Sequence, residues 1–139
     1  MAWWGWALVS ALAAAAVSIL AKLGMQSIPS NLATAIRTVV ILVFAWSLVL
    51  LRGEAAHLGS ISRRGLLFLV LSGLATGVSW LAYFRALQLG PASRVAPIDK
   101  LSLVFIALLG VGLLGETFTV RYGVGLALVM AGVLLTTLG

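Results

Sequence analysis

The sequence contains no cysteine and few charged residues. Of its 139 residues, nine are Lys or Arg, three are Asp or Glu and one is His. Without a thiol there is no disulfide, cysteine-ligated zinc centre or cysteine nucleophile. The carboxylates Glu54, Asp99 and Glu116 and the single His57 are scattered along the chain, so a hydrolytic site is hard to assemble. We therefore expect neither an enzyme nor a protein that binds a metal or cofactor.

Apolar residues dominate what is present. They make up 63% of the chain and charged residues only 9%, whereas soluble domains have about 45 to 50% and 25%. A soluble bundle buried in a larger assembly would have too few polar residues to cover its surface. The net charge of +6 is spread over short loops and helix ends without a basic stripe, which argues against nucleic acid and for anchoring in a lipid bilayer. The composition therefore predicts an integral membrane protein.

Five apolar segments are long enough to cross a membrane as helices. At about 1.5 Å per residue, roughly 20 residues span a hydrocarbon core of about 30 Å. Trp3, Trp4 and Trp6 near the start are typical of an interfacial aromatic belt and not of a cleaved signal sequence. We predict one all-α transmembrane domain over residues 1–139, with helices at about 3–22, 32–51, 65–89, 94–114 and 119–138.

The fourth segment carries Asp99 and Lys100 one to two turns inside its start, with Pro97 in its first turn. A charge near the bilayer middle costs at least about 2.5 to 3.5 kcal/mol, so such residues usually face a wet cavity or the interior of a bundle. On a continuous helix the two side chains point about 100° apart and cannot easily satisfy each other. They mark either a transport pathway or a buried network that locks helices together.

Three further residues are candidates for the same pathway. Arg37 lies inside the second segment, where it either extends to the headgroups or faces a cavity. Trp80 and Tyr83 in the third segment either present their rings to a ligand or pack at the interface and in the core.

Secondary candidates surround these residues. Ser72 and Thr76 share one face of the third helix with Tyr83, and that face is suited to line a polar cavity. Arg85 follows near the helix end as a membrane anchor or a partner for Asp99. Glu116, after the fourth helix, is an interfacial or capping carboxylate or part of the pathway.

The charges of the loops give little orientation. With a cytoplasmic amino terminus, the inside has four basic residues, Arg52, Arg63, Arg64 and Arg121. The outside has Lys22 and Arg94, or five residues if Arg37, Arg85 and Lys100 are included. This weak bias under the positive-inside rule suggests dual topology, with two copies forming an inverted pair.

The segment from Arg85 to Val133 resembles the EamA half-domain of the drug/metabolite transporter superfamily. The residues that carry the resemblance are Ala86-Leu87, Ala92-Ser93, Pro97, Leu114-Gly115-Glu116, Gly125 and Ala131-Gly132-Val133. Lys22-Leu23-Gly24 and Arg37 extend it more loosely over the rest of the chain.

The resemblance implies a fold and a function. Members of the family generally have ten helices in two inverted five-helix repeats and mostly export small metabolites across the cell membrane. This chain has one repeat, which implies an antiparallel homodimer or pairing with a homologous half. The run Pro97 to Ser102 looks like that of single-repeat members, so no substrate is carried over from longer relatives.

Our first functional hypothesis is a carrier of small polar metabolites that works by alternating access, with Arg37, Trp80, Tyr83, Asp99 and Lys100 lining its site. The alternative is a membrane scaffold or accessory subunit that transports nothing itself and whose charged pair docks a partner helix. A carrier should keep Asp99 or Lys100 accessible to water, and a scaffold should bury both. An ion channel has less support, because no ring of charges or carbonyl-lined loop is visible.

Overall fold

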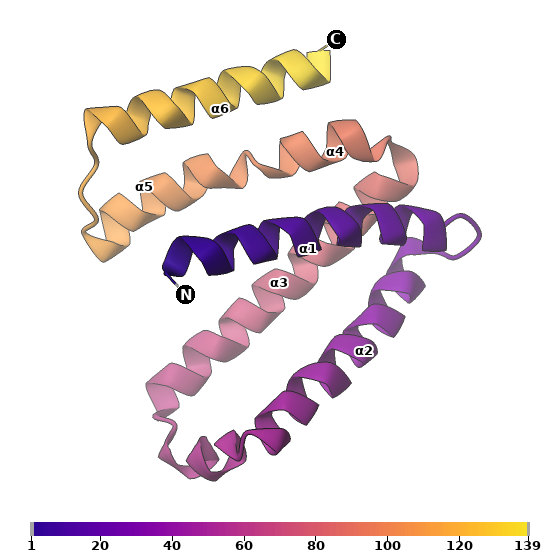
Figure 1. Ribbon diagram of the computed structural model, residues 1–139, viewed down its shortest axis with the longest axis vertical. Helices are drawn as coiled ribbons and strands as arrows, with labels where there is room; N and C mark the ends of the chain where they lie inside the picture. The colour runs from indigo at the N-terminus through magenta and orange to yellow at the C-terminus, as the bar shows by residue number, and fades with distance from the viewer. Residues whose placement is uncertain (1, 139) are drawn as a thin grey trace. The chain divides into compact units, whose positions relative to one another are not determined.

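The computed structural model describes residues 2–138, and every regular element in that range is helical. The elements are α1 (Trp3–Gly24), α2 (Ser30–Leu51), the 3₁₀ helix η1 (Glu54–Ser60), α3 (Arg63–Leu89), α4 (Ala92–Asp99), α5 (Ser102–Leu114) and α6 (Val120–Leu138) (Figure 1). In the described range, five stretches are long and apolar enough to span a membrane, with α4 and α5 together forming the fourth. This confirms the all-helical prediction and its five spans.

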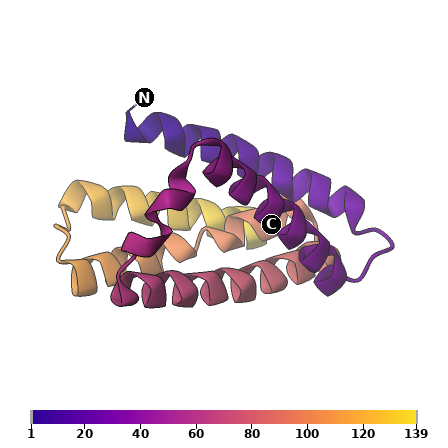
Figure 2. The same cartoon turned by 90° about the horizontal axis from the view of Figure 1, so that it is seen from below.

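The chain divides into two compact units, Met1–Leu89 and Gly90–Gly139. In the first unit, α1 and α2 both pack against α3, and η1 joins α2 to α3 (Figures 1 and 2). The core of this unit is small: Phe84 is 1% exposed and Leu87 is 0% exposed. Ala21 of α1 and Ala33 of α2 are also buried, and their small side chains allow close approach of helices.

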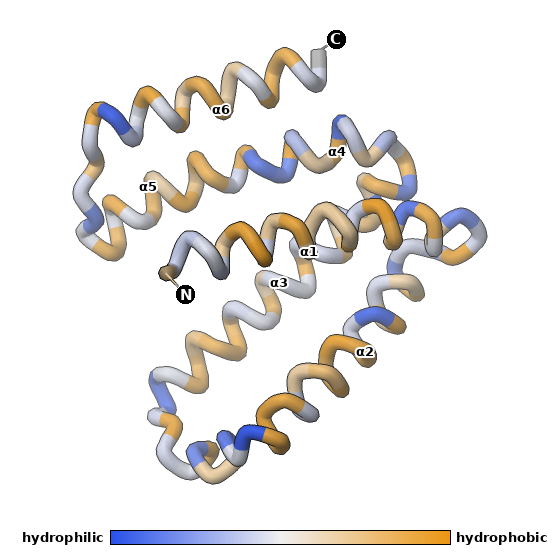
Figure 3. Tube along the Cα trace, in the orientation of Figure 1, coloured by the Kyte–Doolittle hydropathy of each residue, from blue (hydrophilic) through white to orange (hydrophobic). Residues whose placement is uncertain are grey.

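Most large apolar side chains of the chain point outward. Leu12, Phe44, Leu69 and Leu108 are examples, all exposed. Figure 3 shows the hydropathy of the residues along the trace, with apolar spans and with hydrophilic residues mainly near helix ends and at the α4–α5 junction. Apolar patches of this extent fit contact with lipid or with another membrane helix.

In the second unit, α6 returns alongside α4. The helix α5 ends at Leu114 and is capped by Gly115, whose φ of 67° is the left-handed conformation that glycine adopts without strain. The N–H of Glu116 then donates a hydrogen bond of 3.1 Å to the carbonyl of Gly110. Glu116 therefore closes the helix through its backbone. A Cβ on Gly110 would lie 2.6 Å from Oε2 of Glu116, so the carboxylate also folds back against α5.

The structure differs from the sequence prediction in the fourth span. We expected one helix over 94–114, but α4 ends at Asp99 and α5 begins at Ser102. Pro97 lies inside α4, has no N–H to donate and crowds the preceding turn. The interruption lies after the proline, however, so Pro97 alone does not account for its position.

Candidate functional site

The interruption of the fourth span places two charged residues where the α-helical hydrogen bonds stop. The N–H groups of Lys100 and Leu101 donate to the carbonyls of Pro97 and Ile98, each at 2.9 Å. Those of Leu103 and Val104 donate to Lys100 and Leu101, each at 3.0 Å. These bonds link residues three apart, as in a 3₁₀ turn, and such turns within a helix often mark a hinge or a strained segment.

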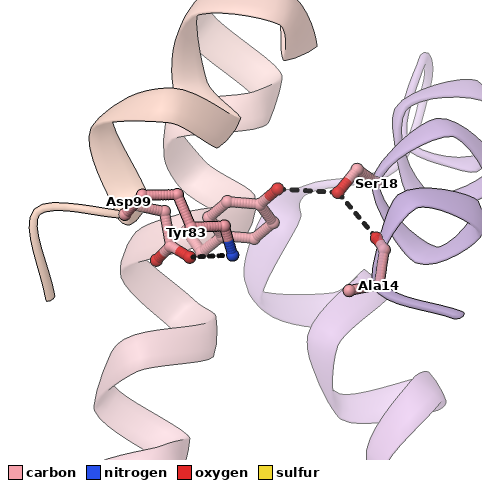
Figure 4. A network of polar contacts seen from close by, with 5 residues as sticks. Ala14, Ser18, Tyr83 and Asp99 are labelled. Carbon is pink, nitrogen blue, oxygen red and sulfur yellow. Dashed lines mark hydrogen bonds and ion pairs between the residues drawn. The ribbon is translucent and has the colours of Figure 1, made fainter. Parts of the chain in front are cut away.

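Asp99 and Lys100 form a long ion pair at the interruption. Lys100 Nζ lies 3.8 Å from Asp99 Oδ2, with side chains that are 57% and 44% exposed (Figure 4). We expected that the two side chains cannot easily satisfy each other, and the contact between them is correspondingly long. At this distance and exposure the pair is weakly held, so both groups stay available to another partner.

The pair lies well inside the span. Asp99 is seven residues from Ala92, about 10 Å along the helix, and Lys100 is fourteen residues from Leu114, about 21 Å. Because the hydrocarbon core is about 30 Å thick, neither group lies at a membrane boundary. Charges at this depth need water, a solute or protein around them.

Arg37 has a partner inside the first unit. Its guanidinium carbon lies 4.1 Å from the centre of the Phe84 ring, within the range of a cation–π interaction. Since Phe84 is buried and belongs to α3, this contact joins α2 to α3. Arg37 also lines an apolar groove of about 430 Å³ between α1 and α2, which includes Ala21 and Val40.

Tyr83 is also engaged. Its hydroxyl lies 2.7 Å from that of Ser18, and Ser18 donates a 3.0 Å hydrogen bond to the carbonyl of Ala14 (Figure 4). Because Ser18 has one hydroxyl proton, Tyr83 donates to Ser18. This hydrogen bond ties α1 to α3. Trp80, half-buried one turn earlier, lines a separate groove between α2 and α3 together with Thr38 and Gly77.

Arg85 binds within its own helix. Its Nη1 donates a 2.9 Å hydrogen bond to Oε1 of Gln88, and Nε2 of Gln88 donates a 3.1 Å bond to the carbonyl of Ile28. Nearby, Nζ of Lys22 donates to the carbonyl of Leu87, one of the last four of α3. Such carbonyls have no partner within a helix, so Lys22 caps α3.

The remaining candidates are on exposed surface. Ser72 and Thr76 are exposed on α3, and the Thr76 hydroxyl donates a 2.9 Å hydrogen bond to the carbonyl of Ser72. This local bond partly satisfies Thr76 without a neighbouring helix. The three described carboxylates and His57 form no cluster that could hold a metal ion in the range 2–138.

Comparison with known proteins identifies the family. Residues 1–138 match the family described as "EamA-like transporter family". The chain belongs to the EamA-like transporter family. It is also 52% identical over 133 residues to a protein of Sinorhizobium sp. named "Uncharacterized transporter in cobO 3'region", covering 96% of this chain and 94% of that protein. No solved structure matches.

Membership of the EamA-like transporter family makes this chain a multi-pass membrane transporter. The family resemblance noted in the sequence is thereby confirmed. The family consists of transporters, which agrees with the expectation of transport and not catalysis.

Within this EamA-like chain, sequence reasoning missed several residues that hold the first unit together. Ser18, Phe84 and Gln88 lie in apolar or helix-end sequence with no motif around them. A signal was nevertheless present for Gln88, a polar residue one turn from the end of a span, where helix carbonyls need donors. The partners of Ser18 and Phe84 depend on which helix faces turn together, which no local pattern specifies.

Proposed function

We propose that this chain is a carrier of small polar metabolites in the cell membrane, and that it binds its substrate at the interruption between α4 and α5. The observation that supports this best is the exposed Asp99–Lys100 pair, about 10 Å inside a membrane span. A scaffold would be expected to bury both charges.

The backbone at the interruption supports the same role. Irregular backbone at membrane depth is tolerated where it is buried in protein or lines a water-filled cavity. In secondary transporters, interrupted helices near the midplane contribute helix ends to substrate and ion sites. Here α4 ends and α5 begins within three residues, beside one carboxylate and one ammonium group.

The two charges suggest the chemistry of the substrate. Asp99 attracts a cationic group and Lys100 an anionic group, so a zwitterion or a polar metabolite with both kinds of group would be bound at two points. Arg37 and Tyr83 are assigned to holding α2 and α1 against α3, in keeping with their contacts to Phe84 and Ser18.

We propose that the carrier operates as an antiparallel homodimer by alternating access. The chain has a weak charge bias between its two sides, exposed apolar spans and a charged pair that needs surroundings other than lipid. Two copies in opposite orientations would supply the inverted repeats on which such carriers depend.

Transport by the purified protein in liposomes tests the proposal. Uptake of a panel of amino acids and related polar metabolites would be measured for the parent, for Asp99→Asn and for Lys100→Gln. We expect each substitution to lower transport at least about tenfold, because a hydrogen bond to a charged group contributes about 1.5 to 3 kcal/mol. The matched controls are Glu54→Gln and Arg52→Gln, which remove the same charges near the loop between α2 and α3.

Two results would contradict this assignment. If the parent transports and Asp99→Asn and Lys100→Gln transport equally well, the substrate site lies elsewhere. If the parent transports nothing alone but does so when a homologous chain is added, the chain is an accessory subunit of a heteromeric transporter. The exposed apolar faces of both units are compatible with that arrangement.

A further inference from the structure

A second polar site lies at one end of the first unit, where the α1–α2 loop meets the end of α3. Residues of the loop, of the start of α2 and of the end of α3 line a groove of about 660 Å³. Its lining includes Ser27, Ser30, Asn31, Arg85 and Gln88. Arg85 is its one charged lining residue, and none of the chain's three carboxylates lines it. The groove is therefore positively charged.

The amino end of α2 opens into this groove. The first N–H that bonds within the helix belongs to Ala33, which donates to the carbonyl of Pro29 at 3.0 Å. The N–H groups of Ser30, Asn31 and Leu32 precede it and have no acceptor within the helix. Among the described residues, no side chain caps this end. Uncapped N–H groups and the helix dipole both favour an anion.

Ser30 gives independent evidence for a ligand. The residue is 4% exposed and lines the groove. Its backbone carbonyl accepts a hydrogen bond from Thr34, but within residues 2–138 its hydroxyl has no hydrogen-bond partner. Among the described residues, no side-chain nitrogen or oxygen that is shielded from solvent lacks a hydrogen-bond partner. The oxygen of the Ser30 hydroxyl is therefore reached from the groove and is left for a bound group.

Arg85 is held beside this end of α2. Gln88 accepts from Arg85 and donates to the carbonyl of Ile28, so one amide fixes both the guanidinium and the loop that precedes α2. Arg85 uses one N–H in this contact and has four others for a ligand. A guanidinium held in this way is suited to binding a phosphate oxygen at two points.

The position of the groove along the span agrees with a ligand at the membrane surface. Arg63 and Arg85 lie 22 residues apart on α3, about 33 Å along the helix, compared with about 30 Å for the hydrocarbon core. The two arginines therefore reach opposite headgroup layers.

We propose that this groove binds an oxyanion of the phosphate type through Arg85, the Ser30 hydroxyl and the first N–H groups of α2. This site is distinct from the substrate site proposed at Asp99 and Lys100. The phosphate belongs either to the headgroup of an anionic lipid or to a soluble molecule, and the experiment separates these two sources.

The test has two arms. In the first, protein in nanodiscs of phosphatidylethanolamine with phosphatidylglycerol is released into the gas phase, and retained phosphatidylglycerol is measured by native mass spectrometry. In the second, inorganic phosphate is titrated by calorimetry into lipid-depleted protein in a neutral detergent. Both arms compare the parent with Arg85→Gln, Arg85→Lys and Ser30→Ala. The control Arg63→Gln removes the same charge at the other end of the same helix.

We expect Arg85→Gln to lower binding about tenfold or more and Ser30→Ala about threefold, because the guanidinium contributes a positive charge and can bind at two points whereas the hydroxyl contributes one neutral donor. Arg85→Lys should lie between parent and Arg85→Gln, and Arg63→Gln should bind as the parent does. If this ranking of variants appears in the first arm and not in the second, the ligand is a lipid headgroup. If it appears in the second arm, the ligand is a soluble oxyanion.

The proposal is overturned if neither ligand binds, or if Arg63→Gln weakens binding as much as Arg85→Gln. Circular dichroism and gel filtration show whether each variant folds. If Arg85→Gln does not fold, the binding of Arg85→Lys and Ser30→Ala tests the proposal instead. Binding equal to that of the parent in both variants would overturn the proposed site.

Discussion

The end of the first unit and the interruption of the fourth span both place polar groups in apolar sequence, but they satisfy these groups differently. In the first unit, Arg37 lies over Phe84 and Tyr83 donates to Ser18, so these two candidate residues each have a protein partner. At the interruption, Asp99 and Lys100 have a long contact with each other and remain about half exposed. A polar residue in a membrane span is therefore not by itself evidence of a pathway. The absence of a firm partner is what distinguishes the second region.

The contrast leads to opposite expectations for substitution. Residues of the first unit should matter for stability and little for substrate chemistry. Residues at the interruption should matter for transport, and replacing them should not destabilise the protein. In the folded state, charges at membrane depth raise the free energy unless their surroundings compensate.

The largest expected effect is on stability, from Phe84→Ala. This change removes a buried ring and the partner of Arg37, and truncating a buried Phe costs about 3 to 5 kcal/mol. We expect a loss of that size in the free energy of unfolding, measured by steric trapping in bicelles. The control is Phe68→Ala on the same helix, where the ring is 58% exposed. Equal losses for the two variants would show that the first unit has no packed core at Phe84.

The next effect has the opposite sign. Replacing both Asp99 and Lys100 with Leu should raise the free energy of unfolding, because the pair is weakly held and charges at membrane depth are costly. Transport should be abolished in the same variant. A clear loss of stability, seen in the same steric-trapping assay, would mean that the pair is a structural network and not a substrate site.

The smallest effect concerns the hydrogen bond between Ser18 and Tyr83. A double-mutant cycle with Ser18→Ala and Tyr83→Phe should give a coupling energy of about 0.6 kcal/mol, and at most about 1.7 kcal/mol, as for other hydrogen bonds between membrane helices. Transport by Tyr83→Phe should stay near that of the parent. A large loss of transport without a change in stability would return Tyr83 to the substrate pathway.

The sequence was sufficient for the fold class because apolar length and helix geometry determine where a chain can cross a membrane. The start of α2 at Ser30, beside the expected Leu32, illustrates how Pro29 and small polar residues indicate a helix boundary. The interruption at Lys100 was not predicted. The length and apolar character of a span do not indicate where its backbone hydrogen bonds change from linking residues four apart to linking residues three apart.

The candidate site was predicted only as a set of residue types. Asp99 and Lys100 stood out because charges are rare in the spans, and both lie at the interruption. The contact of Arg37 with Phe84 could not be inferred, because it depends on how α2 and α3 pack together. The contact of Arg85 depends on the orientation of the Gln88 amide, which also bonds to Ile28, 60 residues away in the sequence. The role proposed for Ser30 could not be inferred either, because it depends on the groove that the start of α2 forms with the end of α3.

Water access at the interruption tests the central claim most directly. Because the chain has no cysteine, Ser102→Cys and Ser10→Cys each introduce a single thiol by nearly isosteric replacement. Both serines are exposed, and Ser10 lies about 10 Å inside α1, no deeper than Ser102 in its span. A membrane-impermeant methanethiosulfonate reagent would be added to both sides of the membrane. The reagent reacts with the thiolate, which forms where water reaches the thiol. We therefore predict that Ser102→Cys is labelled at least about tenfold faster than Ser10→Cys, and that transported substrate slows the labelling of Ser102→Cys. Equally slow labelling of both would show that no water reaches the charged pair and would contradict the account.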